Sequence, residues 1–71
     1  MRFYTYYTTS ALRNDTLNVQ IEDDDGIPFD VSAVEVRGNK ARHPRGGSWI
    51  DIEQAIELMK ANLKQRNQIT A

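Results

Sequence analysis

Thr16-Leu17-Asn18-Val19-Gln20-Ile21-Glu22 is the stretch that decides the fold. Its apolar and polar residues alternate without interruption, so Leu17, Val19 and Ile21 point to one face and the polar residues to the other. A period of two is typical of a β-strand that buries one face. The segment therefore predicts a sheet that is packed on one side.

Two more strands are expected beside this one. Residues 3–9 are dense in aromatic and β-branched residues, which favour a pleated surface. Residues 30–37 form a third strand, and Asp25-Gly26 supplies the tight turn that leads into it. The three strands together predict an antiparallel meander.

The third strand is irregular in its pattern. The apolar residues of 29–33 and those of 34–36 fall on opposite parities, which predicts a β-bulge near Ser32-Ala33. Alternatively, Asp30 caps a short helical turn and the strand begins four residues after it. Pro28 has no N–H for a ladder, so its part of the strand should lie at an edge or stay unpaired.

Residues 49–66 predict an α-helix. Its apolar residues recur at spacings of three and four and form one stripe, headed by Trp49, which we therefore expect in the core. Ser48 and Asp51 resemble a capping box that opens the helix. Residues 38–47, rich in Gly, are expected to be a loop, and the tail, 67–71, should fray.

The expected architecture is a single small α+β domain of 71 residues, a three-stranded antiparallel β-meander with one C-terminal α-helix packed on one face (βββα). The other face of the sheet is left to water. A chain of this size has a small core, and without Cys it has no disulfide to reinforce it. We therefore expect stabilisation by a partner protein or by homodimer formation.

Composition excludes several classes of site. Without Cys, a Cys-based zinc site cannot form, and His43 is the single histidine. Asp23, Asp25 and Gly26 resemble part of a calcium loop, but that alignment puts Ile21 and Ser32 where carboxylates are required. We expect no metal, no cofactor and no enzymatic activity.

Targeting signals are also missing from the pattern. The first residues have no continuous apolar region of a signal peptide, and no apolar run approaches the roughly 18 residues that cross a bilayer. The absence of Cys suits a reducing compartment. These features predict a cytoplasmic protein with no membrane association.

Charge is unevenly distributed although the formal net charge is only -1. An acidic turn, which consists of Asp23, Asp24 and Asp25 beside Glu22, is expected to bind a basic surface of another protein. A basic loop leads into the predicted helix and suits an anion or nucleic acid. Its candidate residues are Arg37, Lys40, Arg42, His43, Arg45 and Ser48.

Two tyrosines complete the candidate site. If Phe3 and Tyr7 lie under the helix, then Tyr4 and Tyr6 stand on the open face beside Arg2. Exposed aromatic residues anchor protein interfaces and also stack on single-stranded nucleic acid. The sequence therefore favours a non-catalytic protein-binding module of the inhibitor, adaptor or regulatory-subunit type, with a nucleic-acid-binding domain as the alternative.

Overall fold

Strand β2 (Thr16–Glu22) is the most buried strand of an antiparallel sheet. Its apolar residues are buried as the alternation predicts, but Asn18 and Glu22 of the opposite face are buried as well, so the strand is not buried on one face only. It pairs with β1 (Arg2–Thr8) on one side and with β3 (Pro28–Arg37) on the other. The computed structural model describes residues 1–9, 15–43 and 45–68. Residues 69–71 of the predicted tail lie outside the described residues.

Within the described residues the sheet has five strands, in the order β1-β2-β3-β4-β5, where three were predicted. Strands β4 (Lys40–Arg42) and β5 (Ile50–Asp51) come from the segments predicted as loop 38–47 and as the first turn of the helix. Gly38 and Asn39 form a two-residue turn, with Gly38 at φ +61°, that pairs β4 with the end of β3. The predicted meander is correct but less detailed than the structure.

Strand β3 is regular where a bulge was predicted. The register shift between β2 and β3 lies between Ile21 and Glu22, opposite Phe29, and not at Ser32-Ala33. The apolar residues of β3 therefore lie on both faces of the sheet, which explains their change of parity. The alternative of a helical turn capped by Asp30 is also wrong, because this residue lies within the strand.

Strand β4 covers only part of the outer edge of β3. It pairs with Glu35, Val36 and Arg37. Among the described residues, the earlier part of β3 therefore has β2 on one side and no strand on its outer side. Pro28 lies in this uncovered part, as expected for a residue that cannot donate to a ladder.

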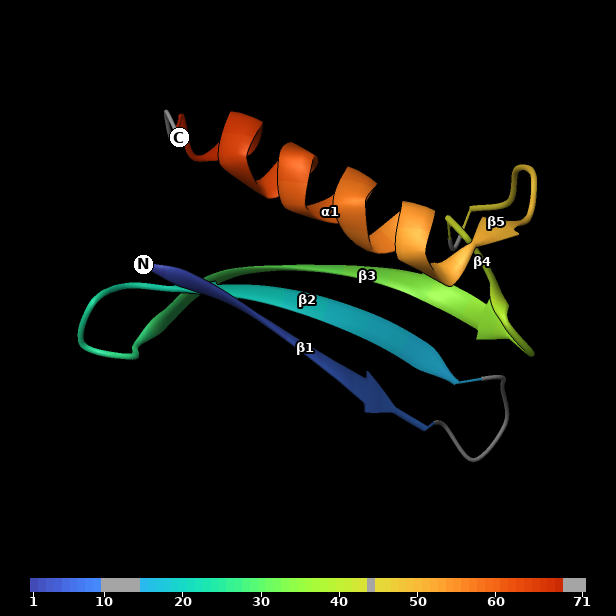
Figure 1. Cartoon of the computed structure of the whole chain (residues 1–71), viewed down its shortest axis with the longest axis horizontal. Helices are drawn as coiled ribbons and strands as arrows, with labels where there is room; N and C mark the ends of the chain where they lie inside the picture. The colour runs from blue at the N-terminus through green and yellow to red at the C-terminus, as the bar shows by residue number, and fades with distance from the viewer. Residues whose placement is uncertain (10–14, 44, 69–71) are drawn as a thin grey trace.

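Helix α1 (Ile52–Arg66) lies across one face of the sheet (Figure 1). It begins three residues later than predicted, because Ile50 and Asp51 pair with β4 as a strand. Asp51 is the N-cap in place of Ser48, and its side chain bonds to Lys40 (2.6 Å) instead of to the helix. Among the described residues no helix is long and apolar enough to cross a membrane.

The core lies between α1 and the sheet. Residues from four elements are buried there, and Phe3 of β1 packs at its margin. The buried apolar residues are Leu17, Val19, Ile21, Val36, Ala41, Ala55, Met59 and Leu63. Trp49 is not among them, so the prediction that it belongs to the core is wrong.

The end of the helix is fastened to β3. Arg66 donates two hydrogen bonds to the Asp30 carboxylate, at 2.9 and 2.8 Å, and Asn67 donates a third at 2.8 Å. These donors, Arg66 first and Asn67 second, lower the pKa of Asp30 to about 2. Asn67, which was predicted to fray, is therefore held in place.

Candidate functional site: the open face of the sheet

The register of the strands defines which side chains share the face opposite α1. Residues that pair directly in antiparallel strands lie on the same face. Six residues of β1, β2 and β3 form the middle of this open face in two adjacent rows. We call them the tyrosine band: Tyr4, Tyr6, Asn18, Gln20, Val31 and Ala33.

Exposed aromatic and aliphatic groups dominate the tyrosine band. Tyr4 is 50% exposed and Val31 is 46% exposed. The rings of Tyr4 and Tyr6 touch at a centroid distance of 5.8 Å and an angle of 34°. The register places both tyrosines on the face opposite α1, and Phe3 packs against the core, but Tyr7 is 56% exposed and is not buried under the helix as the expectation assumed.

Asn18, in the middle of the band, bonds to residues of the neighbouring strand β1. Its side-chain amide donates to the Thr8 hydroxyl (3.0 Å) and to the Tyr6 carbonyl (3.4 Å). The residue is only 9% exposed, so these bonds satisfy an amide that water scarcely reaches. The Asn18 side chain thus connects β2 to β1.

One end of the band is closed by an ion pair. Arg2 donates to the Glu22 carboxylate at 2.8 Å, and Gln20 donates to the same carboxylate at 2.9 Å. These two hydrogen bonds, Arg2 first, hold the pKa of Glu22 below its usual range. The carboxylate is ionised at neutral pH and forms a polar rim beside Tyr4.

The other end of the band is closed by Trp49. Ile50 pairs with Ala41 on the helix side of the sheet. The adjacent residues, Trp49 and Arg42, therefore lie opposite each other on the open face. The Arg42 guanidinium lies 4.5 Å from the indole centroid and that of Arg37 lies 5.3 Å from it. Trp49 is thus part of a partly exposed cation–aromatic cluster and does not belong to the helix stripe that the spacing predicted.

The acidic turn is partly used by the fold. The Asp23 carboxylate accepts hydrogen bonds from the backbone N–H groups of Asp25 and Ile27, both at 2.9 Å, and so shapes the hairpin. Asp24 pairs with the amino group of Met1. Asp25 is exposed, and Gly26 supplies the left-handed position of the turn at φ +79°. The Asp25 carboxylate has no hydrogen bond or ion pair with other described residues, although its backbone N–H bonds to Asp23.

The basic residues do not form one loop as predicted. Lys40 bonds to Asp51 and Arg42 bonds to Glu35 at 3.4 Å, so two of the cations are partly neutralised. The backbone N–H of Arg45 donates to Nδ1 of His43, and the Arg45 and Ser48 side chains are exposed. The acidic turn and strands β4 and β5 lie at opposite ends of the molecule, whose longest dimension is 34 Å (Figure 1).

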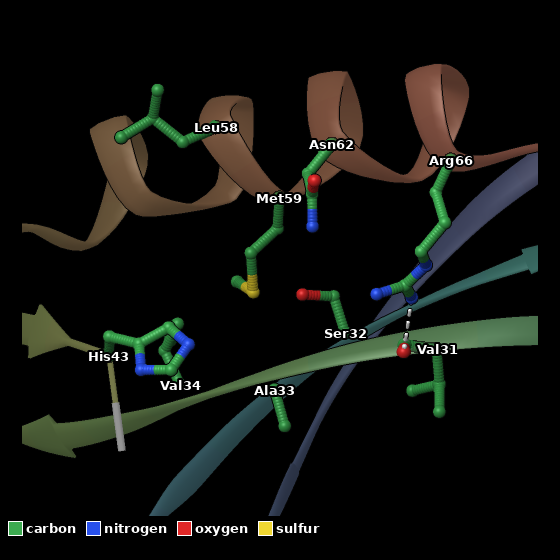
Figure 2. A pocket seen from close by; sticks show the side chains of 9 residues that line it. All are labelled: Val31, Ser32, Ala33, Val34, His43, Leu58, Met59, Asn62 and Arg66. Atoms are coloured by element: carbon green, nitrogen blue, oxygen red, sulfur yellow. Dashed lines mark hydrogen bonds between the residues drawn. The ribbon is translucent and has the colours of Figure 1, made fainter. Parts of the chain in front are cut away.

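A shallow groove of about 310 Å³ lies between β3 and α1 (Figure 2). Asn62 and Met59 reach down from the helix towards Ser32, and His43 and Arg66 lie at the two ends. Arg66 also donates to the Val31 carbonyl at 3.0 Å, which occupies part of the strand edge that lines the groove. The described residues contain no cluster of three His, Asp or Glu side chains that suits a metal ion.

Sequence reasoning missed four members of the open face. Val31 and Ala33 were attributed to a bulge, although their shared parity with Phe29 was the signal for an apolar second face. Glu35 and Trp49 join the face through strand pairs that involve β4 and β5, and strands this short leave no periodic signal. Comparisons of the chain with protein-family models, curated proteins and solved structures found no match.

Proposed function

We propose that the chain is a small non-catalytic module that binds another protein through the tyrosine band. The observation that carries this proposal is the exposure of Tyr4 and Val31 in the middle of a rigid face that the helix leaves uncovered. Protein interfaces typically combine an aromatic and aliphatic centre with a polar rim. The ion pair of Arg2 with Glu22 and the cluster around Trp49 supply such a rim at the two ends.

The charge distribution supports a partner with two oppositely charged regions. Asp25 at one end and Arg37 and Arg45 at the other are exposed and have no ion-pair partner among the described residues. A partner that carries basic groups opposite the acidic turn and acidic groups opposite β4 would be oriented along the long axis. Such complementarity fixes orientation and speeds association more than it adds affinity.

Site-specific photo-cross-linking tests the proposal, in a lysate of cells from the organism that encodes the protein. A photoreactive residue in place of Val31 should capture a defined protein, and the same residue in place of Gln54, exposed on α1, should not. Tyr4→Ala should abolish capture from position 31. Capture that is equal at both positions, or that survives Tyr4→Ala, would argue against the tyrosine band as the binding site.

Nucleic acid is the alternative ligand. The guanidinium groups of Arg37 and Arg42 beside Trp49 favour it, since cations and aromatic rings together bind single strands. The bonds of Arg42 to Glu35 and of Lys40 to Asp51 count against it, because they reduce the charge available to phosphates. A mobility-shift titration discriminates: salt-sensitive binding that is lost in Arg37→Glu would favour nucleic acid over the protein partner.

A further inference from the structure

Strand β1 has one edge without a partner strand among the described residues. The direction of its backbone groups follows from the pairing of the sheet. The N–H of Val36 donates to the carbonyl of Asp15 at 2.9 Å, so Val36 directs its backbone groups towards β2. Antiparallel pairs alternate between bonded and non-bonded, so Val34 and Ser32, two and four positions earlier, also face β2.

The same alternation passes from β2 to β1. Leu17 and Val19, which pair with Val34 and Ser32, bond to β3, so Asn18 and Gln20 bond to β1. Their partners in β1 are Tyr6 and Tyr4, whose backbone groups therefore point towards β2. The hydrogen bond from the side-chain amide of Asn18 to the Tyr6 carbonyl agrees with this orientation of Tyr6. The odd residues of β1 therefore point their N–H and C=O groups outwards. These residues are Phe3, Thr5 and Tyr7.

The outward residues are symmetric about Thr5. Aromatic residues stand two positions away on either side, Phe3 and Tyr7, and a second pair stands one position away, Tyr4 and Tyr6. The segment from Phe3 to Thr9 carries no charge and no Pro, which are the residues that normally protect an exposed strand edge.

We propose that β1 pairs with β1 of a second copy, antiparallel, with the two-fold axis at Thr5. Thr5 then exchanges both backbone hydrogen bonds with Thr5 of the second copy, and Phe3 does so with Tyr7 of the second copy. All the outward groups of the three odd residues are satisfied in this register. The two sheets join into one continuous sheet with both helices on the same face.

Side chains fit the same register. Tyr7 is 56% exposed although it lies on the helix side of the sheet, because Lys60 and Lys64 of α1 reach over Phe3 and not over Tyr7. The pairing places Tyr7 beside Phe3 of the second copy. On the open face, Tyr4 meets Tyr6 of the second copy and Tyr6 meets its Tyr4, so the existing Tyr4–Tyr6 contact becomes a cluster of four rings.

The area limits the strength of the dimer. Half-exposed tyrosines each add on the order of 100 Å², so four of them supply a minor part of the roughly 1,200 Å² of a stable interface. We therefore expect a weak, concentration-dependent dimer. This inference goes beyond the proposed function, because it concerns the edge of β1 and not the open face of the sheet. The photo-cross-linking experiment at Val31 on β3 tests the open face independently.

Sedimentation over a concentration series of about 5 to 500 µM tests the dimer, since mass action governs such an equilibrium. The mass of the wild type should double across the series. Thr5→Lys, which puts two like charges at the axis, should weaken association by up to about fivefold. Gln54→Lys adds the same charge on α1 and should leave association unchanged. A wild type that stays monomeric throughout, or equal association in both variants, would overturn the proposal.

Cross-linking checks the register without relying on a disruptive variant. The chain has no Cys, so Thr5→Cys introduces a single thiol at the axis. Directly paired Cα atoms lie about 5.5 Å apart, so a short bis-maleimide should link the copies rapidly. Thr8→Cys on the same strand would lie about 20 Å from its counterpart at roughly 3.3 Å per residue and should link slowly. Equal rates for the two variants would refute pairing at Thr5.

Discussion

Replacement of Leu63 by Ala should destabilise the fold far more than the same change at Leu58. Both leucines belong to α1, but Leu63 is 0% exposed in the core, whereas Leu58 is 56% exposed. Deletion of a buried leucine side chain costs about 2–5 kcal/mol, because transfer energy is lost and a cavity remains. A chain of this length has a total free energy of unfolding of about 4–10 kcal/mol. Leu63→Ala should therefore remove a fifth or more of the stability.

Urea denaturation and thermal unfolding measure this difference, each followed by circular dichroism of the helix at one low protein concentration. Leu58→Ala should stay within about 0.5 kcal/mol of the wild type. Leu63→Ala should lower the midpoint of thermal unfolding by more than about 10 °C, at roughly 4–8 °C per kcal/mol for domains of this size. Similar midpoints for the two variants would refute the packing of α1 against β2 and β3 on which every face assignment depends.

Three other predictions concern particular contacts. Arg66 and Asn67 lower the pKa of Asp30 from 3.8 to about 2 in the folded state. The Asp30 carboxylate therefore stabilises the fold fully at a pH above 3.8, and this contribution is lost as the pH falls towards 2. Asp30→Asn should flatten this part of the stability–pH curve, and an unchanged curve would contradict the prediction. Gly38→Ala should cost about 1–2 kcal/mol of unfolding free energy by denaturation, because Gly38 has a φ of +61°. Trp49→Ala should cost less than Leu63→Ala in the same assay, because Trp49 is only half-buried and its cation–π contact contributes about 0.5–1 kcal/mol. A larger cost would indicate that Trp49 belongs to the core.

The parts of the fold that the sequence predicts are those with a long periodic signal. The seven residues of β2 alternate strictly, and Ala55, Met59 and Leu63 follow helical spacing, so both elements and their mutual packing could be derived. The assignment of Tyr4 and Tyr6 to one face follows from the same periodicity of strands. Each of these inferences depends on several consecutive residues that agree.

Short elements leave no such signal. β4 has a single buried residue, Ala41, between two long cations, and β5 has two residues in all. Both depend on the local turn at Gly38 and Asn39, which was interpreted as the start of a loop, and on the return of residues 50–51 to pair with β4. The same pairing withdraws Trp49 from the helix, although its spacing from Ile52 continues the apolar stripe.

The outward backbone groups of β3 and of β1 are protected to different degrees. By the alternation of the backbone groups, Val31 of β3 points its N–H and C=O outwards, yet Asp30 accepts from the first at 2.8 Å and Arg66 donates to the second at 3.0 Å. These side chains occupy the groups that an added strand would need. For the outward groups of β1, the described residues provide no such cap, so the edge of β1 is open to pairing and the part of β3 that β4 leaves uncovered is partly closed.

Removal of the cap should therefore change the kind of association as well as its strength. Asp30→Ala combined with Arg66→Ala frees the backbone of Val31, and a molecule with two open edges can add copies at both and form open-ended assemblies instead of a closed pair. Sedimentation should then detect species larger than a dimer, while circular dichroism shows that the protein remains folded. Adding Thr5→Lys to this double variant closes the β1 edge and should limit assembly again. If the folded double variant has the mass distribution of the wild type, the side chains of Asp30 and Arg66 do not protect the edge of β3.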